Sequence, residues 1–334
     1  MGSSATPPPA ATPDFLSVFR AQADATGTMT FARFMELALH HPEAGYYRRD
    51  GPRVGYGVGT DFFTASTSGP LFGELVAAAC VTRLGARNPR DYAFVEIGAE
   101  SEAGVLAGVT HPFGATRTVR AGSPLELAGR CVVFSNELLD AQAFHRYVFR
   151  RGAWRELGVT LRSGRLAEVE LAAATPAPLP AAATEGRLFD APLGAAALAR
   201  RIASQPWTGL FIACDYGRTF LELAENCPAG TARAYYRHIQ SNDLLARPGE
   251  QDLTCHVCWD WLAAALAEQG FGDPVVESQE AFFVRYAADF ISGVASAEAA
   301  GFSRKKLSLL QLLHPSHLGQ KFQVLHAFRE EGAG

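Results

Sequence analysis

The feature that most constrains the fold is a short apolar run that ends directly in polar residues. Residues 131–134 read CVVF, which is typical of a buried strand. Ser135, Asn136 and Glu137 follow this run, and Asp140 comes three residues after Glu137. Open α/β sheets bind ligands just beyond the carboxyl ends of their strands. The run therefore predicts an α/β sheet with an amide and two carboxylates at its ligand-binding edge.

Further apolar runs alternate with segments of helical periodicity. Strands are expected at residues 92–98, around 119, and at 210–215 and 322–328, with a hairpin within 146–170. Helices are expected at 15–25, 30–40, 70–84, 191–204 and 259–269, and over most of 281–313. This alternation predicts a parallel-rich α/β sheet, and the Ala- and Pro-rich stretch 171–186 predicts a solvated loop or linker.

Composition limits the classes of function. The chain has 334 residues and a formal net charge of −4, so general affinity for nucleic acid is not expected. No apolar run reaches the length of a membrane-spanning helix. The six cysteines come without a signal peptide, which favours free thiols in a reducing, cytoplasmic setting. Residues 1–14 are rich in Pro, Ala, Ser and Thr and are expected to form a disordered tail.

Glycine and acidic residues follow the strand at 92–98. Gly98 ends this strand and Gly104 would open a helix, which is the usual place for a nucleotide-like ligand to lie against the backbone. Glu100 and Glu102 would repel a pyrophosphate, which disfavours NAD or FAD, whereas a zwitterionic sulfonium ligand would tolerate them. An ordinary strand-to-helix turn would explain the same residues equally well.

Other polar clusters also have plain structural explanations. Asn136 could cap a helix, Asp61 lies in a loop able to cap the helix after it, and Asp215 could start a turn. Capping accounts for only one or two of the polar residues after the 131–134 strand, which favours a functional role there. A single Cys-x-x-Cys at 255–258 has no second pair at suitable spacing, so no metal site is expected.

Taken together and in order, these segments resemble the MidA family of class I S-adenosylmethionine-dependent methyltransferases, which includes the mitochondrial complex I assembly-factor methyltransferase. The resemblance spans residues 31–325. It rests on HPEAGYY at 41–47, DFFTAS at 61–66, LFGE at 71–74, VEIG at 95–98, NELLDA at 136–141, DYG at 215–217, GTARAYYRH at 230–238 and PGEQDLTCHV at 248–257.

The resemblance implies an architecture and an activity. A single methyltransferase domain over 15–330 would hold a Rossmann-like core over about 90–330, a helical flanking lobe over about 15–85 and an inserted hairpin. The implied cofactor is S-adenosyl-L-methionine, and the implied reaction is methyl transfer to a protein side chain, with arginine expected. A respiratory-complex subunit as substrate and a homodimeric state are further expectations.

Residue roles follow from the motifs that match the family. The expected catalytic residues are Glu137, Asp140 and Asp215, whose carboxylates would pair with a guanidinium and leave one nitrogen lone pair free for in-line attack on the methyl. The expected cofactor-binding residues are Asp61, Thr64, Ser66, Glu96, Gly98 and Asn136. The expected substrate-binding residues are Tyr235, His238, Asp252 and His256.

The chain departs from the family at its cofactor motif. The family pattern Glu-x-Gly-x-Gly-x-Gly becomes residues 96–102 with acids in place of glycines, and such side chains would crowd a cofactor that lies on the backbone. The stretch 104–131 is shorter than in the family, and Arg120 stands where an acid would bind ribose hydroxyls. Two alternatives therefore stay open: an assembly or binding factor that no longer uses the cofactor, and a nicotinamide-dependent oxidoreductase.

Overall fold

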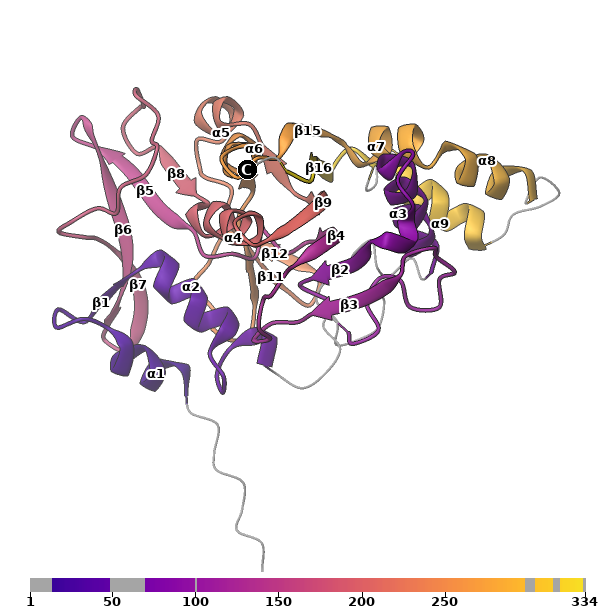
Figure 1. Ribbon diagram of the computed structural model, residues 1–334. Coiled ribbons are helices and arrows are strands. Elements are labelled where there is room, and N and C mark those ends of the chain that lie inside the picture. Colours follow the sequence, from indigo (N-terminus) through magenta and orange to yellow (C-terminus); the bar gives the residue numbers. More distant parts are fainter. Residues whose placement is uncertain (1–13, 49–69, 100, 298–303, 315–318, 333–334) are drawn as a thin grey trace, which may run out of the picture.

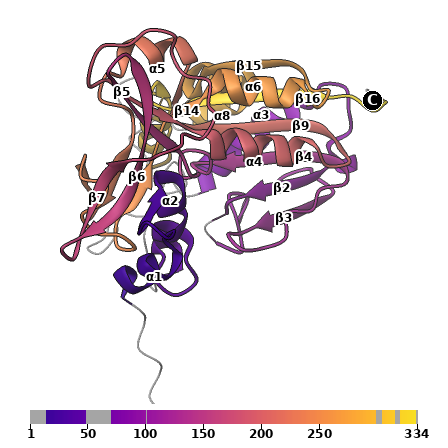
Figure 2. The same ribbon diagram turned by 90° about the vertical axis from the view of Figure 1, so that its left-hand side faces the viewer.

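A parallel-rich core sheet and a smaller antiparallel sheet lie side by side in the molecule (Figures 1 and 2). The computed structural model describes residues 14–48, 70–99, 101–297, 304–314 and 319–332. Helices cover both faces of the core sheet. The expected α/β fold class is confirmed.

The core sheet has the strand order β15-β16-β9-β4-β2-β3. The four strands from β9 to β3 run parallel, whereas β16 is antiparallel to both of its neighbours. The central strands are apolar along nearly their whole length because both faces of the sheet are covered. The strands are β2 (Ala93–Ile97), β3 (Ala115–Val119), β4 (Gly129–Asn136), β9 (Trp207–Asp215), β15 (Gly272–Ser278) and β16 (Gln323–Arg329).

Two groups of helices bury the faces of this sheet. One face packs against α3 (Pro70–Leu84), α7 (Gln279–Tyr286), α8 (Ala288–Ala297) and α9 (Arg304–Leu313). The other face packs against α4 (Leu193–Ala203) and α6 (Trp259–Ala267). The short α5 (Phe220–Asn226) begins in a capping box, in which Thr219 and Glu222 satisfy each other's backbone N–H groups.

The antiparallel sheet has the order β1-β6-β5-β8, with β7 also paired to β6. Its strands are β1 (Thr28–Thr30), β5 (His145–Arg150), β6 (Ala153–Arg162), β7 (Arg165–Glu170) and β8 (Leu188–Ala191). The hairpin expected within 146–170 is thus part of a larger sheet. A further three-stranded sheet consists of β11 (Arg233–Tyr236), β12 (Ile239–Ser241) and β13 (Asp252–Thr254), and β10 (Gly217–Arg218) pairs with β14 (Val257–Cys258).

The N-terminal helices divide between the two sheets. Helices α1 (Phe15–Gln22) and α2 (Phe31–His40) pack with β1 and β6 in one apolar cluster, while α3 belongs to the core sheet. The segment 15–85 thus contributes helices to both sheets. Thr30 caps α2 by accepting the Arg33 N–H at 3.1 Å, and the buried residues of this helix recur at helical spacing. Two short 3₁₀ turns are η1 (Tyr46–Arg48) and η3 (Pro89–Asp91).

Three local expectations are wrong. No helix opens at Gly104, because the described residues between β2 and β3 form only turns. Asn136 does not cap a helix either, since a turn follows β4. The stretch 171–186 is irregular but not simply solvated: the Trp154 indole donates to the Pro180 carbonyl at 2.8 Å, and the Tyr147 hydroxyl donates to the Thr175 carbonyl at 2.6 Å.

Candidate functional site

A cavity of about 950 Å³ opens at the carboxyl ends of β2, β3 and β4. Its core wall comes from the core sheet and the turns that follow its strands: Ile97, Gly98, Arg120, Asn136, Glu137 and Asp140. Its outer wall comes from η1, β11, β13 and the residues after β13: Tyr47, Arg233, Tyr235, Asp252, Thr254 and His256. Parallel topology thus places the cavity at the edge of the sheet that binds ligands in open α/β folds.

On the core wall, Gly98 and Asn136 present backbone and amide groups to the cavity. Gly98 has a φ of +83°, a left-handed conformation that glycine adopts without strain. A Cβ at this position would lie 2.7 Å from Leu138 Cδ1, so the residue has no room for a side chain. The Asn136 Nδ2 donates to Glu137 Oε1 at 3.0 Å, while its Oδ1 is buried without a hydrogen-bond partner. That oxygen can accept a hydrogen bond from a ligand.

The turn of residues 137–140 is held by Asp215 at the end of β9. One oxygen of the buried Asp215 carboxylate accepts the backbone N–H of Leu139 at 2.8 Å and that of Asp140 at 3.3 Å. The other oxygen accepts the Tyr216 N–H at 2.8 Å. Glu137 itself has a φ of +49°, which is uncommon for a residue with a side chain. Asp215 is absent from the cavity lining and fixes the turn that presents Glu137 and Asp140.

On the outer wall, the small sheet turns one face toward the cavity. Tyr235 pairs with Asp252 and Arg233 pairs with Thr254, so alternate residues of both strands lie on that face. The Tyr47 hydroxyl donates to Asp252 Oδ1 at 3.1 Å. This bond joins η1 to β13 and orients the Asp252 carboxylate.

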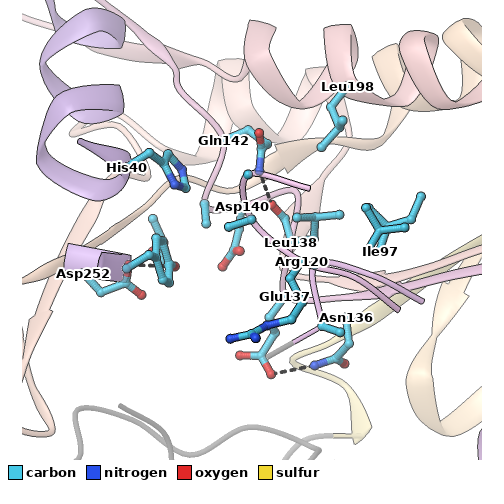
Figure 3. A pocket seen from close by; sticks show the side chains of 18 of the residues that line it. His40, Ile97, Arg120, Asn136, Glu137, Leu138, Asp140, Gln142, Leu198 and Asp252 are labelled. Carbon is cyan, nitrogen blue, oxygen red and sulfur yellow. Dashed lines mark hydrogen bonds between the residues drawn. The ribbon is translucent and has the colours of Figure 1, made fainter. Parts of the chain in front are cut away.

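Three carboxylates share the cavity, and Asp140 lies between Glu137 and Asp252 in Figure 3. Burial, followed by the charges of Asp215, Glu137 and Asp252, raises the pKa of Asp140 well above its usual range. Burial also raises the pKa of Asp215 to about 7, although the N–H groups bonded to it oppose the shift. Such a concentration of negative charge favours a cationic guest.

The remaining predicted site residues fall into three groups. Asp61, Thr64 and Ser66 lie outside the described residues. Glu96 and His238 are described but do not line the cavity. The Glu96 side chain accepts the Val105 N–H at 2.5 Å and holds the loop after β2, whereas His238 is exposed at the β11–β12 turn.

The acidic residues of the altered glycine motif do not all crowd the cavity. The Glu102 side chain is 92% exposed and lies 3.8 Å from Arg120, measured between carboxylate oxygen and guanidinium nitrogen. Glu100 lies outside the described residues. An unblocked cavity beside Gly98 argues against the expectation that Glu102 would exclude a cofactor.

Several lining residues were not assigned a site role from the sequence. His40 and Tyr47 come from the end of α2 and from η1, and their rings stack with centroids 5.2 Å apart. Tyr216 and Arg233 also line the cavity. Tyr47, Tyr216 and Arg233 each lie within a motif on which the family resemblance rests. Their positions in these motifs were the only indication in the sequence that they could line the site.

Comparisons with known proteins agree with this geometry. A family model described as "Putative S-adenosyl-L-methionine-dependent methyltransferase" matches residues 118–273. A protein from Burkholderia thailandensis, solved with bound S-adenosyl-homocysteine, has a TM-score of 0.81 at 24% identity, over 94% of this chain and 91% of that one. The resemblance to the MidA family of methyltransferases is confirmed. The description of the family model names S-adenosyl-L-methionine as the cofactor of the methyltransferases that it describes.

Two further relatives extend the similarity over most of the chain. A second, uncharacterized protein from Burkholderia thailandensis has a TM-score of 0.77 at 22% identity, over 94% of this chain and 91% of that one. A Danio rerio protein named "Protein arginine methyltransferase NDUFAF7, mitochondrial" is 24% identical over 90% of this chain and 83% of its own length. No helix within the described ranges has the length and hydropathy to cross a membrane.

The residues of the core wall fit a nucleoside-bearing sulfonium cofactor. Gly98 lets a ligand approach the backbone at the end of β2, and the unpartnered Asn136 oxygen offers it an acceptor. The neighbouring carboxylates of Glu137 and Asp140 are compatible with a positively charged sulfur.

Proposed function

We propose that this protein transfers a methyl group from S-adenosyl-L-methionine to an arginine side chain of a polypeptide. The observation that carries the proposal is the meeting of three carboxylates, Glu137, Asp140 and Asp252, in the methyltransferase cavity. A guanidinium has a delocalised positive charge and donors that match carboxylate oxygens. The name of the Danio rerio relative, a protein arginine methyltransferase, supports the same acceptor.

In this proposal the two walls of the cavity have different roles. Gly98 and Asn136 hold the cofactor, while Glu137 and Asp252 pair with the guanidinium and limit its rotation. When bound, S-adenosyl-L-methionine supplies an electrophilic methyl group, whose transfer forms an N–C bond and leaves the sulfur with the electron pair of the broken C–S bond. Holding the acceptor nitrogen in line with that methyl replaces a bimolecular encounter by a unimolecular step.

The methylated nitrogen must also lose a proton. Asp140 is the proposed acceptor, because burial and three neighbouring carboxylates raise its pKa and make its ionised form a stronger base than an ordinary aspartate. Asp215 has a positioning role, since its oxygens are occupied by backbone N–H groups of the turn.

The test compares Glu137→Gln with Glu126→Gln, an exposed acid outside the cavity. Methyl transfer to arginine-containing peptides is followed by mass spectrometry, and S-adenosylhomocysteine binding by calorimetry. Loss of one charge-assisted contact in the site predicts a fall in kcat of about a hundredfold for Glu137→Gln. Cofactor binding and the Glu126→Gln control should stay near the wild-type values.

Two results would contradict the proposal. Wild-type protein that binds S-adenosylhomocysteine but methylates lysine or another side chain, and no arginine, would remove the arginine acceptor. Full activity of Glu137→Gln would remove the proposed role of the carboxylates.

A further inference from the structure

Three arginines gather around the loop of residues 227–232, next to the outer wall of the cavity. The backbone N–H of Leu188 donates to the Pro228 carbonyl at 3.0 Å, which places Arg187 at the start of this loop. At its other end, Arg233 Nη1 donates to the Ala232 carbonyl at 2.7 Å. All three guanidinium groups, of Arg187, Arg218 and Arg233, lie close enough to Cys227 to act on its thiol.

His256 lies between two of these arginines. β10 pairs with β14, so that Gly217 is opposite Val257 and Arg218 is opposite Cys258. On the other side, Arg233 pairs with Thr254. Burial and then the charges of Arg218 and Arg233 lower the pKa of His256 to about 4, so its imidazole is neutral at physiological pH.

Within the part of the chain that the structure describes, no carboxylate lies within ion-pair distance of these cations. No ion pair forms there to Arg187, Arg218 or Arg233. The Nε atoms of Arg187 and Arg218 and the Nδ1 of His256 are buried without a hydrogen-bond partner. Partly buried charges normally have partners, because removing them from water is costly.

The nearest carboxylates are already used elsewhere. Asp190 Oδ1 accepts from Arg146 Nη1 at 2.6 Å, and its Oδ2 accepts the Thr231 N–H at 2.8 Å. Glu222 is held in the capping box of α5 by the Thr219 N–H and hydroxyl. The charge of Arg218 contributes to a lowered pKa of Glu222, but neither side chain forms an ion pair with the arginine cluster.

We propose that Arg187, Arg218, Arg233 and His256 form an anion-binding subsite beside the methyl-transfer cavity, and that it takes an acidic side chain of the polypeptide acceptor. The arginine forks suit a carboxylate, and the neutral imidazole adds a hydrogen bond. The assignment of the anion to the acceptor rests on the proposed function.

The spacing of residues along this segment explains why one acceptor can reach both the carboxylates of the cavity and the anion-binding subsite. Asp252, Thr254 and His256 follow one another at every second position and all line the cavity. Two residues of strand span about 7 Å, so the anionic end with Asp252 and the cationic end with His256 lie within a few residues of extended chain. An acceptor with its arginine at Asp252 therefore presents neighbouring side chains to the subsite.

The first experiment tests the subsite without any acceptor. Glutarate, a dicarboxylate probe, is titrated into the full-length protein while the His256 ring resonances are followed by NMR. We expect a saturable shift in wild-type protein and in the exposed control Arg162→Gln, with affinity about tenfold weaker in Arg218→Gln and Arg187→Gln. Retained S-adenosylhomocysteine binding shows that each variant is folded. No saturable shift in wild-type protein would overturn the subsite.

The second experiment tests the source of the anion. Two arginine peptides, one with Glu and one with Gln two residues from the arginine, are compared by calorimetry. We expect about tenfold tighter binding of the Glu peptide by wild-type protein, and no preference in Arg218→Gln. Equal affinities with glutarate still bound would overturn the assignment to the acceptor. Peptides that neither bind nor accept methyl groups would instead contradict the proposed function, while the glutarate result still decides the subsite.

Discussion

The core wall and the outer wall of the cavity are assembled in different ways. The core wall consists of residues that follow parallel strands, so the topology of the sheet alone brings Gly98 and Asn136 together. The outer wall brings Tyr47 against Asp252, two residues that lie 205 positions apart in the sequence. The core wall follows from the topology of the sheet, whereas the outer wall depends on contacts between segments far apart in the chain. We expect the first to govern cofactor binding and the second to govern the acceptor.

The largest effect is expected at Asp215, which holds the turn that presents Glu137 and Asp140 to the cavity. Asp215→Ala leaves the buried N–H groups of Leu139 and Tyr216 without their acceptor, which should cost about 4 kcal/mol of folding stability. Urea unfolding measures this loss, and methyl transfer should fall with it. The exposed Asp289→Ala is the control. A loss below about 1 kcal/mol would show that the turn does not depend on Asp215.

Asp252→Asn should affect the outer wall alone. The charge that pairs with the acceptor is removed while the Tyr47 hydroxyl keeps a partner, so the KM for an arginine peptide should rise about thirtyfold. The Kd of S-adenosylhomocysteine should not change. If the KM for the peptide and the Kd of S-adenosylhomocysteine rise by the same factor, the two walls do not act separately.

Gly98→Ala should affect the core wall alone. The new methyl would lie 2.7 Å from Leu138 Cδ1, so the Leu138 side chain, which lines the cavity, or the backbone at Gly98 must shift. S-adenosylhomocysteine should bind about tenfold more weakly, as measured by calorimetry. Gly108→Ala is a matched control, because Gly108 also has a positive φ, of +69°, but has no atom within 4 Å of the added Cβ. Equal effects of the two substitutions would attribute the loss to backbone strain alone.

The smallest effect concerns pH. The folded-state pKa of Asp140 is raised, so between the unfolded and folded pKa values the native state binds more protons than the unfolded state, and stability falls as pH rises. Asp140→Asn removes this term. Its stability relative to wild type should therefore rise from about pH 5 to about pH 8, as measured by urea unfolding. A constant difference between the two proteins would show that Asp140 is ionised at both values.

The sequence predicted best the elements whose pattern is local. The helix expected at 70–84 coincides with α3, and the helix expected at 30–40 corresponds to α2, which begins at Phe31. The apolar runs that became β4 and β9 could be recognised because both faces of these strands are buried. The polar β15 was missed, since its residues are only partly buried and show no clear alternation.

The site was predictable where strand ends define it and not where distant segments meet. Asn136, Glu137 and Asp140 were correctly placed together because they follow one strand. Asp215 ends β9, but its carboxylate oxygens accept backbone N–H groups of Leu139 and Tyr216 instead of facing the cavity. The sequence does not show which partners these oxygens have. The ring of Tyr47 and the arginines around His256 depend on contacts between segments far apart in the chain.

One backbone hydrogen bond joins the two walls. The N–H of Cys255 donates to the carbonyl oxygen of Asp140 at 2.9 Å, so the turn after β4 is tied to the segment that follows β13. A ligand that orders the turn therefore also orders its neighbour across the cavity. By thermodynamic linkage, the factor by which the cofactor changes the affinity for the acceptor equals the factor by which the acceptor changes the affinity for the cofactor. We therefore expect each ligand to bind more tightly when the other is present.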